Sequence, residues 1–252
     1  MDFLFVIILG GIWGSFANVC IYRLPLSKKG ILTGRSLCPK CKKKILWYDN
    51  IPIISFLLLQ AKCRKCKKTI SSKYLFVEAF NIISFVTIYY LFEISLTTIF
   101  LMILSLTFLI IFFIDLKHFI IPNTLTYPMM GLGFVKSFDP NLNPIFPNYI
   151  DSLIGGFFGY GIIWAIIFFY KQIRKKEGMG LGDAKLLAVI GFWFGWSSIP
   201  FVIFFSSIIA LIFVLPNLIN KTKKMSSEIP FGPHIIIAAI FYLFLQDKLI
   251  FL

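Results

Sequence analysis

Long apolar stretches separated by short polar segments dominate this chain. A membrane-spanning helix needs about 20 predominantly apolar residues. The pattern supplies five such stretches before residue 171, at Phe3–Tyr22, Tyr74–Phe92, Ile94–Ile114, Phe119–Val135 and Ser152–Tyr170. It therefore predicts an all-α membrane protein.

The stretch Leu186–Leu218 contains no charged residue. As a single helix it would be about 50 Å long, whereas the hydrocarbon core of a bilayer is about 30 Å thick. Two short spans with a hinge near Ser197-Ser198-Ile199-Pro200 fit this length better. With a last span at Pro233–Ile250, the sequence predicts about eight transmembrane helices.

The positions of Lys and Arg predict the orientation of these spans. Cytoplasmic loops carry the excess of Lys and Arg. If the first span is retained with its N-terminus outside, the loop Arg23–Lys73 lies inside with 14 cations, and only Lys136 and Lys248 of the 25 Lys and Arg fall outside. A single span over Leu186–Leu218 would move Lys221–Lys224 to the opposite side, so the charges also favour the hinge.

Composition excludes an ordinary soluble domain. Of the 252 residues, 58% are hydrophobic and 14% are charged, against about a quarter charged in soluble domains. A net charge of +14 would normally suggest nucleic acid. Because the cations lie between apolar stretches, we expect anionic membrane lipids as their partners and no nucleic acid.

Two CxxC motifs, Cys38–Cys41 and Cys63–Cys66, lie 21 residues apart in the basic loop. Four thiolates in this pattern can complete a tetrahedral Zn²⁺ site, and they leave no open position for catalysis. Disulfides are improbable in the reducing cytosol. The sequence predicts a structural zinc ion and three regions: a first transmembrane helix (1–22), a cytoplasmic zinc-binding loop domain (23–73) and a transmembrane core (74–252).

Two acidic residues occur where acids are energetically expensive. Asp115 follows the third apolar stretch, and Asp183 ends the segment Gly180-Leu181-Gly182-Asp183. By the predicted topology both lie at the inner membrane edge. Either could instead be an interfacial residue, and Asp183 could cap a helix or pair with Lys185.

Two carboxyl groups that share a site retain one proton between them. The ionised partner can activate a water for attack on a peptide carbonyl, and the protonated partner can hydrogen-bond the carbonyl oxygen. Gly180 and Gly182 would let an extended substrate backbone approach Asp183. The pair therefore indicates an aspartyl protease.

The chain resembles the type IV prepilin peptidases, a family of leader peptidases and N-methyltransferases in the GxGD class of intramembrane aspartyl proteases. The resemblance is carried by six ordered blocks: Gly14–Pro25, the paired CxxC motifs, Asp49-Asn50-Ile51-Pro52, the segment Asp115 to Pro122, Gly180–Lys185, and Glu228-Ile229-Pro230-Phe231-Gly232-Pro233.

This resemblance implies a substrate and a location. Prepilins and pseudopilins carry a short basic leader that is cut after a glycine at the cytoplasmic face of the bacterial inner membrane, and many members methylate the new N-terminus with S-adenosylmethionine. By motif, Asp115 and Asp183 would be catalytic and the four cysteines would bind zinc. Glu78 would receive the leader's charge, and Glu228 would support the site; each could instead be an acid at a helix N-terminus.

Two other functions remain open from the residues alone. Intramembrane acids often bind a cation or proton, as in a transporter or channel. A zinc-braced scaffold in a secretion complex would need no chemistry at all. No strand-turn-helix unit with a GxGxxG motif is present to bind S-adenosylmethionine.

Overall fold

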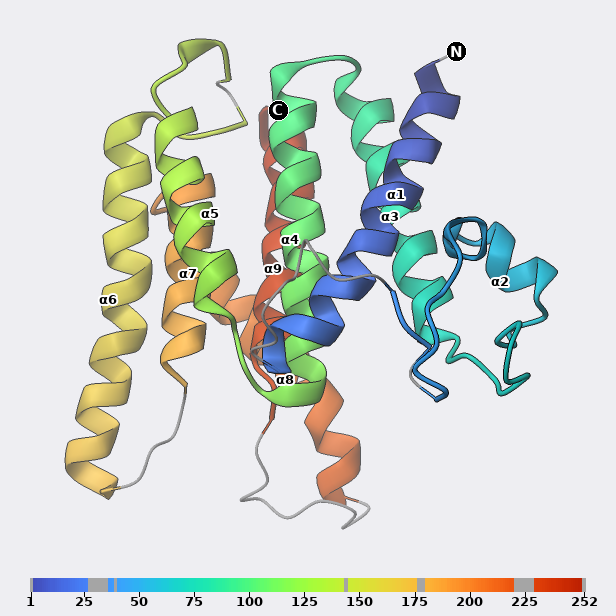
Figure 1. Ribbon diagram of the computed structural model, residues 1–252. Coiled ribbons are helices and arrows are strands. Elements are labelled where there is room, and N and C mark those ends of the chain that lie inside the picture. The colour runs from blue at the N-terminus through green and yellow to red at the C-terminus, as the bar shows by residue number, and fades with distance from the viewer. Residues whose placement is uncertain are drawn as a thin grey trace. The chain divides into compact units, whose positions relative to one another are not determined.

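The computed structural model describes residues 2–26, 36–38, 40–142, 145–175, 180–219 and 229–250. For residues 216–219 and 247–250 it describes the backbone only. The described residues are helical, with two isolated β-bridges. The α-helices are α1 (Asp2–Arg23), α2 (Ile54–Leu58), α3 (Lys73–Phe92), α4 (Leu96–His118), α5 (Asn123–Lys136), α6 (Tyr149–Arg174), α7 (Leu181–Phe194), α8 (Ser198–Ile219) and α9 (Gly232–Ile250) (Figure 1). Short 3₁₀ helices occupy Leu24–Leu26, Trp47–Asn50 and Pro140–Leu142.

The prediction of an all-α membrane fold is confirmed. Among the described residues, five helices are long and apolar enough to cross a membrane: α1, α3, α4, α6 and α8. The helices α5 and α7 have 14 residues each, or about 21 Å, and the apolar part of α9 is also short. The count of eight spans stays a prediction, and the basic cluster Lys221–Lys224 lies outside the described residues.

Two predicted boundaries are wrong by a few residues. The fourth span was expected from Phe119, but α5 begins at Asn123 because Pro122 has extended geometry and cannot continue a helix from α4. The predicted hinge lies slightly too late. The chain breaks at Gly195, whose φ of +80° requires a glycine, and Pro200 belongs to the first turn of α8, where proline is tolerated.

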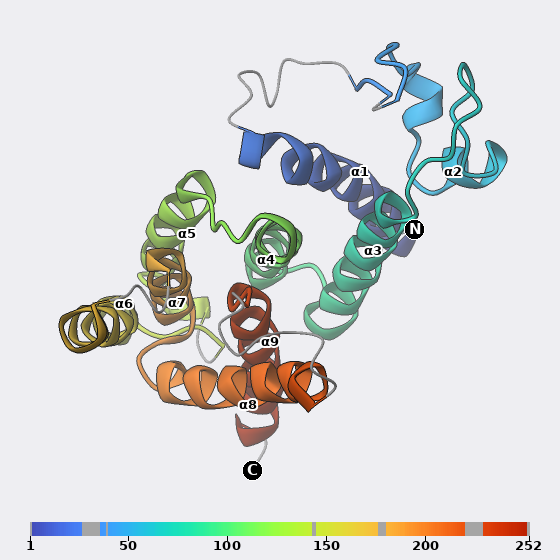
Figure 2. The ribbon, with the colours of Figure 1, turned by 90° about the horizontal axis from the view of Figure 1, so that it is seen from below.

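The chain forms two compact units, residues 1–110 and 111–252. In the first unit α1 packs along α3, and Figure 2 shows the two helices side by side. Gly10 and Gly14 permit this approach, because a Cβ on Gly14 would lie 2.9 Å from the Cα of Glu78. The buried Asn81 donates its side-chain amide to the Gly10 carbonyl at 2.7 Å, which fixes the register of the pair.

The second unit is built around α7, which packs on both α5 and α6. Glycines on α6 and α7 bring the helix backbones into contact: a Cβ on Gly155 would lie 2.5 Å from the carbonyl oxygen of Gly191. On the other side, the buried Lys136 of α5 donates to the Trp193 carbonyl at 3.1 Å. These contacts hold the C-terminal part of α7, and the helices α8 and α9 pack on each other.

Candidate functional site

Asp115 lies in the last turn of α4 and is 5% exposed. The backbone N–H of Gly232, at the start of α9, donates a hydrogen bond of 3.0 Å to its Oδ2. A Cβ at Gly232 would lie 2.7 Å from that same oxygen. Only a glycine can therefore bring this amide so close to the Asp115 carboxyl group without displacing it.

Asp183 lies in the first turn of α7 and is 8% exposed. Its backbone N–H donates to the carbonyl of Gly180 at 3.1 Å, which forms the turn that starts the helix. The carboxylate of Asp115 acts on that of Asp183 electrostatically. The second unit thus brings together two acids, predicted from the sequence, that lie 68 residues apart in the chain.

Ile121 connects the parts of this cluster. It follows α4 and is 8% exposed. A Cβ at Gly182 would lie 3.1 Å from the Ile121 Cβ, and a Cβ at Gly232 would lie 3.2 Å from the Ile121 Cδ1. We call Asp115, Ile121, Asp183 and the two glycines the aspartate cluster.

The two glycines of Gly180-Leu181-Gly182-Asp183 have different surroundings. The space beside Gly182 is taken by Ile121. Gly180 is exposed, and among the described residues a Cβ there would meet only the Gly182 nitrogen and the Asp183 Oδ2, each at 3.8 Å. An approaching backbone therefore has more room at Gly180 than at Gly182.

Lys185 lies one half-turn after Asp183 and has partners of its own. Its Nζ donates to the Asn123 Oδ1 at 2.8 Å, and it lies 5.4 Å from the centre of the Tyr127 ring. Among the described residues no ion pair joins Lys185 to Asp183. Lys185 therefore ties the start of α7 to the start of α5.

Glu78 belongs to the first unit. Its Oε2 accepts the backbone N–H of Ile53 at 2.9 Å, and its Oε1 accepts the side-chain amide of Asn18 at 3.5 Å. Asn18 also donates to the Tyr74 carbonyl at 3.1 Å. Both carboxyl oxygens of Glu78 thus have partners within the protein. Glu228 lies outside the described residues.

The four cysteines form one cluster. All four Sγ atoms lie within 4.8 Å of one another, and the Sγ atoms of Cys38 and Cys66 are 3.9 Å apart. Sulfur atoms around a tetrahedral Zn²⁺ with Zn–S bonds of about 2.3 Å are roughly 3.8 Å apart. The arrangement fits a metal ion.

Each CxxC motif adopts the same turn. The first cysteine donates its N–H to the carbonyl five residues later, Cys38 to Lys43 at 3.0 Å and Cys63 to Lys68 at 2.9 Å. The residue after each second cysteine has a positive φ, 56° at Lys42 and 57° at Lys67. Backbone N–H groups of Cys66 and Lys65 bond the Cys63 sulfur and lower the pKa of its thiol to about 6, which favours the thiolate that a metal requires.

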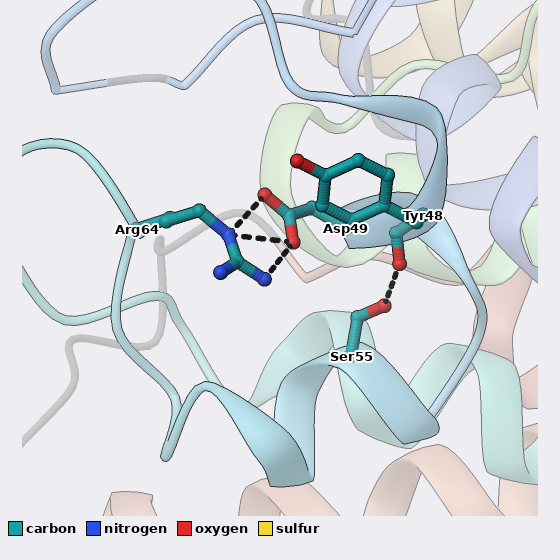
Figure 3. A network of polar contacts seen from close by, with 4 residues as sticks. All are labelled: Tyr48, Asp49, Ser55 and Arg64. Carbon is teal, nitrogen blue, oxygen red and sulfur yellow. Dashed lines mark hydrogen bonds and ion pairs between the residues drawn. The ribbon is translucent and has the colours of Figure 1, made fainter.

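The second CxxC turn is also tied to the segment between the two motifs. Arg64 binds the Asp49 carboxylate through both Nε and Nη2, with the shortest contact at 2.7 Å, and lies 5.4 Å from the Tyr48 ring centre. Ser55 donates its hydroxyl to the Tyr48 carbonyl at 2.7 Å (Figure 3). These contacts hold residues 48–55 against the metal-binding turns.

Sequence reasoning missed two features. It assigned no role to Gly232, although the segment Pro230-Phe231-Gly232-Pro233 is the signal that could have found it, since glycine at a helix start permits close backbone approach. It also missed that Ser36–Ile45 and Ala61–Ile70 are an internal repeat at a spacing of 25 residues. The repeat predicts two equivalent turns, which the hydrogen bonds display.

Comparisons with known proteins cover nearly the whole chain. Residues 8–92 match the family described as Bacterial Peptidase A24 N-terminal domain, and residues 99–215 match the Type IV leader peptidase family. A prepilin leader peptidase/N-methyltransferase of Vibrio cholerae serotype O1 is 38% identical over 255 residues, which cover 97% of this chain and 98% of that protein. Proteins of the same name from Pseudomonas aeruginosa and Aeromonas salmonicida are each 31% identical, and the matches cover 96% and 89% of this chain and 90% and 84% of those proteins. No solved structure matches significantly.

Proposed function

This chain belongs to the type IV leader peptidase family, and on that premise we propose that it removes the leader peptide from type IV prepilins or pseudopilins and methylates the new N-terminus. The proposal assigns the cleavage to Asp115 and Asp183. The main support for this assignment is the hydrogen bond from the Gly232 N–H to the Asp115 carboxyl group. This carboxyl group also lies close enough to Asp183 for the two to interact electrostatically.

The two carboxyl groups would have different roles in peptide hydrolysis. A backbone N–H stabilises negative charge on the oxygen that it contacts. We therefore assign Asp115 as the ionised base, which takes a proton from the attacking water. Asp183 then holds the shared proton, hydrogen-bonds the scissile carbonyl oxygen, and helps the amine leave as the C–N bond breaks.

The substrate would reach this pair along the exposed side of Gly180. A peptide must be extended to present its carbonyl to two carboxyl groups, and a side chain at position 180 would narrow the space beside the Asp183 Oδ2. Lys185, held by Asn123, keeps the start of α7 in place in this scheme. Gly182 contributes by packing on Ile121, which also packs beside Gly232.

We assign zinc to the four-cysteine cluster. Four thiolates match the ligand preference of Zn²⁺ and close its coordination shell, so the ion would stabilise the fold and take no part in hydrolysis. The short segment around the cysteines has little core of its own: among its described residues, only Cys38 and Ser55 are buried. A bound metal would supply the missing folding energy.

Methylation requires a methyl donor, and S-adenosylmethionine is the donor that the N-methyltransferase name of the relatives implies. The described residues contain no strand-turn-helix unit that could bind a nucleotide in the usual way. In the overall reaction one methyl group would pass from the donor to the free N-terminal amine, which loses a proton.

We further propose that the chain lies in the bacterial inner membrane with its N-terminus outside, and with the aspartate cluster and the cysteines on the cytoplasmic side. The distribution of Lys and Arg supports this orientation. Anionic lipid head groups would then be the partners of the basic loop.

Mass spectrometry of the product tests both activities together. Purified enzyme is incubated with a full-length prepilin and labelled S-adenosylmethionine in inner-membrane lipid vesicles. The expected product begins directly after the leader glycine and carries one labelled methyl group. An intact prepilin would refute the proposal, and a shortened but unmethylated product would restrict it to the peptidase.

A further inference from the structure

Residues 51–59 are an apolar run within the basic cysteine loop. Their sequence, Ile-Pro-Ile-Ile-Ser-Phe-Leu-Leu-Leu, contains no charge, although the surrounding loop Arg23–Lys73 carries 14 Lys and Arg. Within α2, one face exposes Ile54 (55%), Leu57 (62%) and Leu58 (79%). The hydroxyl of Ser55, on the other face, is turned inward to the Tyr48 carbonyl. A face with this composition is costly in water.

The start of this run packs against the middle of a transmembrane helix. A Cβ on Gly11 would lie 3.4 Å from the Cβ and Cγ of Pro52, and 3.7 Å from the Cδ1 of Ile82. Gly11 is 12 residues from the end of α1 at Arg23, or about 18 Å along the helix axis. Ile82 is at the midpoint of α3. Since the hydrocarbon core is about 30 Å thick, Pro52 lies at membrane depth.

Figure 1 agrees with this depth, since it draws α2 beside the helical turns of α3 and not beyond their end. The run lies between the two CxxC motifs in the sequence, and these motifs meet in space, with the Sγ atoms of Cys38 and Cys66 3.9 Å apart. The chain therefore leaves the metal cluster, runs back along α1 and α3, and returns to the cluster.

Most backbone N–H groups of the run have partners within the protein, which lowers the cost of placing the run in lipid. Ile53 has φ +59° and ψ −53°, a γ-turn conformation that is strained for a β-branched residue, and Ile54 donates to the Pro52 carbonyl across this turn. The turn leaves the Ile53 N–H without a backbone partner, and the carboxylate of Glu78 accepts it at 2.9 Å. Further along, Ser55, Leu57 and Leu59 donate to the carbonyls of Ile51, Ile53 and Ser55.

From this packing we propose that residues 51–59 form a re-entrant turn that dips into the bilayer beside α1 and α3, exposes Ile54, Leu57 and Leu58 to lipid acyl chains, and is held by Glu78. The partner of this surface is lipid. A soluble protein partner would need the turn to project from the membrane, which its contact with the middle of α1 does not allow. Glu78 acts here as a positioning residue that ties the metal-binding loop to the membrane core.

Carbene labelling of the unmodified protein tests the proposal. The full chain is placed in vesicles of phosphatidylethanolamine and phosphatidylglycerol that contain a phospholipid with a diazirine at the end of one acyl chain, and labelled peptides are identified by mass spectrometry after illumination. We expect label in residues 51–59 at a level similar to the exposed positions Phe5 and Ile8 of α1, and several-fold above residues 61–70. Equal labelling of 51–59 and 61–70 would overturn the proposal.

A matched pair of substitutions gives a second readout. Leu58 and Thr69 are both exposed in the same loop. We expect Leu58→Asp to lower the thermal midpoint in vesicles by several degrees, because it places a carboxylate in hydrocarbon, whereas Thr69→Asp leaves the midpoint within a degree or so. Equal midpoints for the two variants would count against the re-entrant turn, whatever the enzyme's activity.

Discussion

The backbone N–H of Gly232 donates a hydrogen bond of 3.0 Å to the Asp115 carboxylate, across 117 residues of sequence. This bond joins the end of α4 to the start of α9 next to Asp183. It makes the residue before Pro233 part of the candidate active site and gives the two acids unequal surroundings. Unequal surroundings are what allow one acid to act as base and the other to keep the proton.

Substitution of Gly232 therefore tests the environment of Asp115. In Gly232→Ala the new Cβ would lie 2.7 Å from Oδ2, so either the amide or the carboxylate must move. A hydrogen bond to a charged group is worth about 1.5–3 kcal/mol, so we expect kcat for leader cleavage to fall by roughly ten- to a hundredfold. Gly131→Ala is the control, because a Cβ at Gly131 would meet no atom of the described residues within 4 Å. Equal kcat values in the two variants would exclude a role for the Gly232 amide.

Packing between α6 and α7 makes a prediction about stability. Gly155→Val would place a side chain against the backbone of Gly191, whereas a Cβ at Gly161 on the same helix would meet no atom of the described residues within 4 Å. Both variants share the intrinsic cost of valine in a helix, so their difference reports the packing. We expect the free energy of unfolding to fall by at least about 2 kcal/mol more in Gly155→Val than in Gly161→Val. The measurement is thermal unfolding of both proteins in detergent. Similar unfolding midpoints would mean that these two helices do not pack closely.

The four-cysteine cluster predicts that the protein binds zinc and loses thermal stability when the zinc is lost. Purified protein should contain about one zinc ion per chain, and Cys63→Ser should lose the ion together with thermal stability. Cys20→Ser is the control, since Cys20 lies on α1 and belongs to neither CxxC motif. Metal content is read by elemental analysis. A stable, zinc-containing Cys63→Ser protein without activity would contradict a purely structural role.

Charge in the basic loop should not attract the leader. Prepilin leaders are basic, so the cations of this loop repel them, and we expect the loop to contact anionic lipid instead. Reversing the exposed Lys65, Lys67 and Lys68 to Glu should leave the KM for prepilin equal or lower while weakening binding to phosphatidylglycerol vesicles. A clearly higher KM would show that these lysines bind substrate.

Much of the fold was predictable because the bilayer thickness limits the length of each membrane-spanning helix, and the distribution of Lys and Arg limits its orientation. The uncharged run Leu186–Leu218 could be divided in two from its length alone, and the structure breaks it at Gly195. The residues Asp115, Asp183 and the four cysteines were found because acids are scarce in apolar segments and CxxC pairs are distinctive. These signals are local in the sequence.

The features that escaped prediction depend on contacts between distant segments. Nothing in the pattern around Ile53 shows that its N–H meets Glu78, or that Pro52 reaches Gly11. The apolar run 51–59 is also too short to register as a membrane span. Contacts between such distant segments become visible only in the structure. Several of them occur at glycines, where two backbones can approach most closely.

Cleavage by the two aspartate variants tests the central claim most directly. Asp115→Asn and Asp183→Asn enzymes are purified, checked for wild-type thermal midpoints, and mixed with prepilin, and the fraction of cleaved product is followed over time. Loss of either member of a general acid–base pair should slow cleavage by about 10²–10⁴-fold or more. A correctly folded variant of either residue that cleaves prepilin at the wild-type rate would contradict the account.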